Sequence, residues 1–500
     1  MSNTFEIIIT IFSLLFVLAD LSIRIFTKFN IVEIIITVSI LLVLLALCFR
    51  SNMLANIFKI SDLRKRIVFT IFVLVVYRIG AHIPIPGVNV EALKDYFVQS
   101  QRGGGMMDFF DLFSGGAFKR FSVFALGIMP YISASIIIDL LKTVFPYLGE
   151  LAKEGAEGQK KINQYTKYGT VFLCTIQGFA LTYWMMSNVE GSNVISSDVG
   201  FGFVLTAVIS IVTGTMVLVW MGEIITERGI GNGISLIIMA GIVVRLPESI
   251  YATGRRISDT GEPIVGFILV GLFFLVVAAC ILLTLGTRRI PVQYGKRNVG
   301  GSAVSISSQY IPLRVNAAGV IPIIFASAII VFPSQILRMV GSGVSSNEFL
   351  NKLLNTLYAA LTPGATPYII LYSLLIIFFC FFYTSLRMNP VEIADNLKKY
   401  GGFIPGIRPG KNTSDYLMGT INRLTLFGSI FLALIAIIPD FIIRIYPEQV
   451  PMEMAYLFGG TSLLIVVGVA LDTLKQVESQ LLMRHYDGFL GGKKKLQGRF

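Results

Sequence analysis

The sequence predicts an all-α polytopic membrane protein whose core is ten membrane-spanning helices, built as an inverted repeat of two five-helix halves. Hydrophobic residues make up 54% of the 500 residues and charged residues only 14%. The mean hydropathy is +0.76, which excludes a soluble protein, because a soluble fold of this size needs far more polar surface. Several apolar runs reach the roughly 20 residues that cross a bilayer. One interrupted apolar segment also occurs twice.

The apolar runs place the helices in order along the chain. Two runs, about 5–22 and 31–49, precede the core and predict two extra N-terminal helices. The first is not expected to be a signal peptide, because it lacks a basic start, carries Glu6 and has no small-residue cleavage site. The core spans are expected near 67–83, 118–141, 165–186, 201–222, 233–247, 263–286, 316–337, 367–386, 419–440 and 456–474.

The repeated segment is the most specific pattern in the chain. Residues 125–138 and 317–330 are both apolar stretches interrupted by Gly and Pro. Apolar matches are common in such a chain, but a shared Gly, Pro and Ser at fixed spacing is not. Interrupted helices in corresponding halves of a membrane protein indicate its functional pathway. The matching positions are Gly127 and Gly319, Pro130 and Pro322, Ile132 and Ile324, and Ala134-Ser135 and Ala326-Ser327.

The placement of charge gives the repeat a direction. The formal net charge is +12, and most of the 41 Lys and Arg residues fall in alternate segments between the spans. The positive-inside rule therefore predicts that both ends of the core lie in the cytoplasm. The two copies fall in the second and seventh spans, and an odd shift reverses direction. The repeat is therefore expected to be inverted.

An interrupted segment, 103–117, precedes the second span. It is apolar but too short to cross a bilayer, glycines bracket it, and Asp108 and Asp111 make it a poor lipid-facing element. Irregular backbone at membrane depth is tolerated only when it is buried in protein or lines a cavity. Two interpretations stay open: a short helix folded back into the outer mouth of a pore, or an external loop resting on the surface.

Residues that carry chemistry are sparse. The two histidines, His82 and His485, are too few for a metal or histidine-based active site. The four cysteines lie in or beside apolar runs without metal-binding spacing, and we expect them to pack as small side chains. No catalytic residue, metal or cofactor is predicted. The cysteines are Cys48, Cys174, Cys280 and Cys380.

A series of motifs runs through residues 60–480. In chain order they are IPIPG (83–87), FSGGA (113–117) followed by 125–138, ITERGIGNGIS (225–235), the copy at 317–330, ADNLKK (394–399), IPGIRPG (404–410) and FGGTSLLI (458–465). Each motif alone is weak, but the ordered set is highly specific. In this order the motifs closely resemble the SecY family of protein-conducting channels.

The resemblance implies a passive channel of the cytoplasmic (inner) membrane, not an enzyme. Unfolded secretory polypeptides would cross through an hourglass pore, and membrane segments would leave sideways through a gate between the second and seventh core spans. A motor ATPase or the ribosome would drive transport, since the chain has no nucleotide-binding loop. The implied partners are SecE-like and SecG-like small membrane subunits, the SecA motor ATPase, the ribosome, signal sequences, nascent polypeptides and anionic lipids.

The resemblance also implies site residues, position by position. A ring of aliphatic side chains would seal the pore, because an empty apolar constriction disfavours water and ions. The ring is Ile128, Ile132, Ile234, Ile238, Ile324 and Ile465. The plug would include Met107, Phe109, Phe110, Leu112, Phe113, Gly115 and Gly116. The gate, where small residues let helices approach, would include Pro130, Ser133, Ser135, Pro322 and Ser327.

Basic loops suit phosphate backbones and acidic partners. The docking residues would be Arg288, Arg289, Lys296, Arg297, Lys398, Lys399 and Arg408.

The expected organisation has four parts: an extra hydrophobic hairpin of unknown role (1–50), the first half (51–255), the second half with cytoplasmic loops 287–315 and 387–418 (256–478), and a basic cytoplasmic tail (479–500). Two interpretations of residues 1–50 stay open: a real two-helix hairpin packed beside the first core span, or upstream sequence read from an alternative start codon.

Two other classes of protein compete with a channel. A secondary transporter would also show inverted repeats, but it should carry intramembrane carboxylates, whereas Asp139 and Glu223 lie near expected span ends. A membrane enzyme should show a nucleotide, metal or nucleophile motif, and none stands out.

Overall fold

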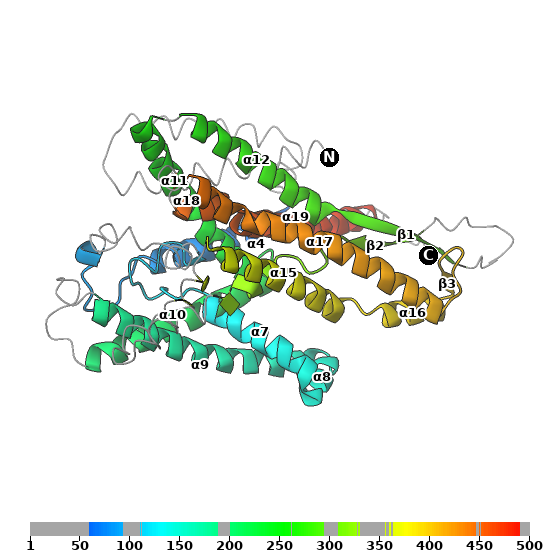
Figure 1. Cartoon of the computed structure of the whole chain (residues 1–500). Coiled ribbons are helices and arrows are strands. Elements are labelled where there is room, and N and C mark those ends of the chain that lie inside the picture. The colour runs from blue at the N-terminus through cyan, green and yellow to red at the C-terminus, as the bar shows by residue number, and fades with distance from the viewer. Residues whose placement is uncertain are drawn as a thin grey trace, which may run out of the picture. The chain divides into compact units, whose positions relative to one another are not determined.

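The structure is a computed structural model of the chain (Figure 1). It describes residues 60–93, 111, 113–188, 201–261, 263–294, 309–327, 329–330, 356, 360–361, 364–446, 450 and 452–490. Outside these residues lie the expected N-terminal hairpin, the end of the tail, and Met107, Phe109, Phe110, Leu112, Lys296 and Arg297. The chain divides into two compact units. The first is Met1–Gly261 with Pro451–Leu457 and Val469–Phe500, and the second is Glu262–Val450 with Phe458–Gly468.

The first unit is helical in its described residues. Helix α10 (Phe201–Arg228) is its centre and packs against α4 (Ser61–Gly80), α9 (Ala156–Asn188) and α11 (Gly233–Thr260). Helix α9 also packs along α7 (Met129–Val144), as Figure 1 shows. A buried apolar cluster fills this unit, and it includes side chains from α9, α10 and the segment before α7.

Local sequence signals set the ends of these helices. Helix α8 (Pro146–Lys153) follows α7 after a bend of 102°, because Pro146 cannot continue the hydrogen-bonding of α7. Helix α11 begins after Asn232, whose side chain accepts a hydrogen bond from the Ser235 N–H at 3.2 Å. It ends at Gly261, which takes the left-handed conformation with φ 71°. Two later helices, α18 (Met452–Phe458) and α19 (Gly460–Leu490), include residues of both units.

The second unit combines helices with a small sheet. Helix α17 (Lys411–Ile445) packs against α12 (Pro263–Leu285), α15 (Thr366–Arg387) and α16 (Pro390–Lys399). Helix α16 has a strong start signal, since the Asn389 side chain accepts a hydrogen bond from the Val391 N–H and Pro390 occupies the first turn.

The sheet corrects the all-α expectation. Strand β1 (Thr287–Tyr294) pairs antiparallel with β2 (Gln309–Arg314) and with β3 (Gly402–Phe403), in the order β2-β1-β3. Ile290 and Val292 are buried on alternate positions of β1, the period of a strand with one covered face. The two basic loops, 287–315 and 387–418, are therefore joined by backbone pairing.

Six of the described helices are long and apolar enough to cross a membrane, and the bent pair α7 and α8 would be a seventh. They are α10, α11, α12, the stretch Thr366–Lys399, α17 and Met454–Leu481. Helix α9 also covers the expected span 165–186, and α4 covers residues 67–80 of the span expected at 67–83. The protein is thus mostly helical and polytopic, while the ten-helix inverted repeat stays a prediction.

The span expected at 118–141 is not one helix. Helix α7 begins only at Met129, and residues 114–128 form turns. Inside the expected span, Phe121 and Gly127 have left-handed φ values of 45° and 56°, which a helix cannot contain. The expected helix start was wrong because hydropathy does not register these backbone conformations.

Candidate functional site

A glycine turn, defined here as residues 113–117, rests directly on α11 in the first unit. All five residues are buried. A Cβ atom on Gly115 would lie 3.0 Å from the Gly241 Cα, and one on Gly241 would lie 3.0 Å from the Phe113 carbonyl oxygen. Only glycine at both positions allows this approach of backbone to backbone. The turn is therefore buried in protein, as the sequence requires of irregular backbone at membrane depth.

The end of α4 fixes the same turn by hydrogen bonds. The Tyr77 hydroxyl donates to the Ser114 carbonyl oxygen at 3.3 Å, and Arg78 Nη1 donates to the Gly115 carbonyl oxygen at 2.7 Å. Two buried carbonyl groups that no helix could satisfy thus have partners.

An ion pair joins this segment to α11. The Arg245 guanidinium pairs with the Asp111 carboxylate, and the two residues are 9% and 0% exposed. The Asp111 Oδ1 also accepts from the Lys119 N–H at 2.9 Å, and its carbonyl oxygen accepts from the Gly116 N–H at 2.9 Å. Sequence reasoning noted Asp111 but missed Arg245. A charge inside an expected span was the available signal.

The IPIPG motif explains how the chain runs from the glycine turn to α7. The Ile85 N–H donates to the Phe121 carbonyl oxygen and the Val123 N–H donates to the Ile83 carbonyl oxygen, both at 3.0 Å. This isolated antiparallel bridge, Pro84 with Ser122, holds a turn in which Phe121 takes a left-handed φ of 45°. Helix α7 can begin only after the bridge ends.

In the first unit, the expected ring residues lie on α7 and α11. Ile128 is the N-cap of α7 and is 5% exposed, while Ile132 lies one turn later and is half-buried. On α11, Ile238 is 6% exposed and Ile234 packs onto Gly222 of α10. The gate residues Pro130, Ser133 and Ser135 belong to the same first half of α7.

In the second unit, the other copy of the repeat has a similar local form. Gly319 has a left-handed φ of 70°, as Gly127 has 56°, and in both copies a helix begins two residues later. Ile324 is 8% exposed, and the Ser327 hydroxyl donates to its carbonyl oxygen at 2.8 Å. Pro322 lies in the first turn and is buried, and Ile465 on α19 is 1% exposed. In both copies, therefore, a left-handed glycine interrupts the chain two residues before the helix begins.

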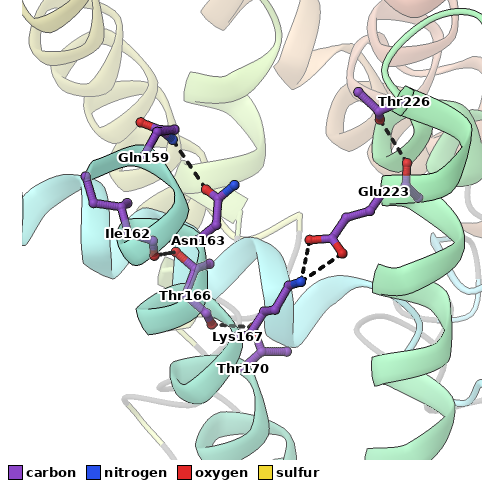
Figure 2. Close-up of polar contacts among 9 residues, drawn as sticks. Gln159, Ile162, Asn163, Thr166, Lys167, Thr170, Glu223 and Thr226 are labelled. Carbon is purple, nitrogen blue, oxygen red and sulfur yellow. Dashed lines mark hydrogen bonds and ion pairs between the residues drawn. The ribbon is translucent and has the colours of Figure 1, made fainter. Parts of the chain in front are cut away.

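Asp139 and Glu223, the two carboxylates that a transporter hypothesis depends on, each pair with a lysine side chain. Figure 2 shows Lys167 of α9 paired with Glu223 of α10, at 2.8 Å. Asp139 pairs with Lys142, also on α7, at 2.7 Å. All four side chains are partly exposed, which is typical of pairs worth about 0–1 kcal/mol. The first pair joins α9 to α10 and the second lies within α7, and neither is a buried binding cluster.

One buried carboxylate was missed by sequence reasoning. Asp440, near the end of α17, is 2% exposed, and Tyr368 and Tyr372 of α15 lie close enough to interact with it electrostatically. The signal was an acidic residue at the end of an expected span. Among the described residues, no group of three or more His, Cys, Asp or Glu side chains could hold a metal ion.

The expected docking residues lie on the sheet and its neighbours in the second unit. Arg288 and Arg289 are exposed on β1, and the Arg289 guanidinium lies 4.8 Å from the centre of the Tyr310 ring. Lys398 and Lys399 are exposed in the last turn of α16. Arg408 is exposed, and the Thr413 hydroxyl donates to its carbonyl oxygen at 2.9 Å. Backbone pairing thus links two segments more than 100 residues apart, each of which carries exposed basic residues.

Comparison with known proteins identifies the family. The family model for SecY matches residues 122–474. The protein translocase subunit SecY of Escherichia coli (strain K12) is 46% identical over 432 residues, covering 86% of this chain and 94% of that protein.

A similar solved structure, described as "The plug domain of the SecY protein stablizes the closed state of the translocation channel and maintains a membrane seal", has a TM-score of 0.55 and 19% identity. Another, "Sec61 in the Canine ribosome-channel complex from the endoplasmic reticulum", has a TM-score of 0.53 and 17% identity. Each alignment covers 87% of this chain and 95% of the other. The chain therefore belongs to the SecY family of protein translocase subunits.

Proposed function

We propose that this chain is the central channel subunit of a Sec protein translocase in the cytoplasmic membrane. Unfolded secretory polypeptides cross the membrane through it. Apolar segments leave sideways into lipid through a gate between the helix of 129–144 and the helix that begins at residue 321. The chain is a passive channel, and a partner supplies the energy.

The observation that carries this proposal is the matched pair of interrupted helices within a chain of the SecY family. Each helix begins two residues after a left-handed glycine, Gly127 or Gly319. In membrane transport proteins, interrupted helices in corresponding halves line the pathway. The ring residues Ile132 and Ile324 occupy equivalent positions in the two copies.

An isoleucine ring suits a polypeptide substrate. Its side chains offer no hydrogen bonds, so that they hold no particular sequence in place. When the channel is empty, the narrow apolar ring disfavours water and ions. The plug, which includes Phe113, Gly115 and Gly116, adds a second barrier on the outer side. The gate helices open along faces of small residues such as Ser133, Ser135 and Ser327, which allow close approach when shut.

The partners follow from the same proposal. SecE-like and SecG-like membrane subunits accompany the channel, and the SecA motor ATPase or the ribosome docks on the basic surface of β1, α16 and Arg408. Lys142, Lys153, Lys160 and Lys161 set the topology and contact anionic lipid headgroups. Both ends of the helical core lie in the cytoplasm, in accord with the charge bias.

Cysteine cross-linking to a polypeptide arrested in transit tests the pathway. Ile132→Cys and Ile324→Cys should each form a disulfide with a single-cysteine substrate halted in the channel, because both side chains face the passing chain. Ile137→Cys and Ile329→Cys are matched controls, since these residues lie on the same helices but are 44% and 38% exposed. Equal cross-linking of control and ring positions, or none at the ring positions, would contradict the proposed pathway.

A further inference from the structure

A charge pair is buried in the first unit, where a charge out of contact with water is unfavourable. Arg245 belongs to the apolar stretch of α11 that is long enough to cross a membrane, and Asp111 is fully buried. Removing both ions from water carries a large free-energy penalty, which is repaid only by close pairing and further hydrogen bonds. Such residues in membrane segments usually serve function.

The pair binds the glycine turn at the place where backbones already touch. Asp111 accepts the N–H groups of Lys119 and Gly116, so that its position sets that of the turn. A Cβ atom on Gly116 would lie 3.6 Å from the Arg245 guanidinium carbon, and the guanidinium therefore covers the turn. Beside it, Gly115 and Gly241 make the close contact. One contact is steric and the other electrostatic, and both fix the turn to α11.

The ion pair and the glycine contact differ in the free energy that is lost when the turn moves away from α11. If the segment enters a water-filled funnel, both charges regain hydration, which offsets most of the lost attraction. The pair therefore defines one shut position strongly while the free-energy difference between shut and open states stays small. A purely apolar contact of the same area would instead expose apolar surface to water on opening.

We propose that the Asp111–Arg245 ion pair is the latch that holds the glycine turn (113–117) of the proposed plug against α11 in the resting channel. This rests on the proposed function above. Asp111 and Arg245 are positioning residues: they do not line the pore but set how often the plug leaves it. The release of this pair is a required step of opening.

Charge exchange tests the latch in the full chain reconstituted in planar bilayers. Asp111→Arg and Arg245→Asp should each raise the resting ion conductance, by about tenfold, since coupling energies of contacting charges of roughly 1–3 kcal/mol correspond to about 5–150-fold. The double variant Asp111→Arg/Arg245→Asp should return toward the parent value. Two single variants with parental conductance, or a double variant that leaks as much as the singles, would overturn the latch.

A second measurement does not depend on charge reversal being tolerated. In Asp111→Cys/Arg245→Cys, a short reducible thiol cross-linker should block polypeptide transit, and a reductant should restore it. Transit at the parental rate through the cross-linked protein would show that the pair need not separate.

If Ile132→Cys and Ile324→Cys cross-link the substrate while both latch tests are negative, the latch is wrong but the proposed channel function is still supported. Failure of those pathway cross-links would instead remove the proposed function itself.

Discussion

At Gly241 the absence of one Cβ atom determines whether the glycine turn can rest on α11. The Tyr77 hydroxyl, the Phe113 carbonyl oxygen and the Gly115 nitrogen all lie within 3.4 Å of the place a Cβ would occupy. Two of these neighbours are backbone atoms, which cannot rotate away. The residue type here therefore controls the seat of the predicted plug, although Gly241 touches no substrate.

Replacing Gly241 with alanine should destabilise this seat. Overpacking of a tight contact costs about 1–3 kcal/mol, whereas alanine in a helix gains up to about 1 kcal/mol over glycine. We expect a lower melting temperature for the purified protein and faster proteolysis near residue 113. Gly254→Ala is the matched control on the same helix, because no atom lies within 4 Å of its added methyl group. Equal melting temperatures for the two variants would argue against the close contact.

Among the elements, the sheet has the clearest consequence for function. Tyr294 pairs with Gly402, so that backbone pairing connects β1 to the segment leading to α17. Beneath them, Ile290, Leu313 and Ile404 form a buried cluster with two residues of α17. The exposed basic residues of two distant loops are thereby held in fixed relation, which suits recognition of a large partner better than two mobile loops would.

Reversing the charge of Arg408 should weaken docking without changing the fold. The side chain is exposed, and its backbone carbonyl accepts a hydrogen bond from the Thr413 hydroxyl. We expect Arg408→Glu to lower the affinity for purified SecA or ribosomes by about tenfold or more, with an unchanged melting temperature. Arg444→Glu at the other end of α17, also exposed, should bind like the parent. Parental affinity of Arg408→Glu would mean that the docking site lies elsewhere.

At the scale of the whole molecule, the features that depend on one continuous stretch of the chain could be predicted from the sequence. Length and hydropathy predicted the helices at 165–186, 201–222 and 263–286, and these are now α9, α10 and α12. The family motifs predicted membership of the SecY family, which the comparisons confirm. These features depend on local composition or on ordered motifs, and both can be read along the chain.

What could not be predicted depends on contacts between distant residues. The start of α7 at Met129 follows from the bridge to residues 83–85, and the ion pair joins Asp111 to Arg245, far along the chain. The sheet was missed because β3 has only two residues and lies about a hundred residues after its partner. The pore ring, the gate and the inverted repeat of ten helices stay predictions, since their residues belong to two units.

The central claim is that Ile132 and Ile324 seal one pore from the two halves of the repeat. The most direct test is the ion conductance of the purified full chain in planar bilayers after both residues are changed to serine. Polar side chains should let water and ions enter, so that the resting channel leaks. The matched variant Ile137→Ser/Ile329→Ser should stay closed, because both of its residues are exposed and neither is a predicted ring position. A parental conductance in Ile132→Ser/Ile324→Ser, in protein that still binds its partners, would contradict the account.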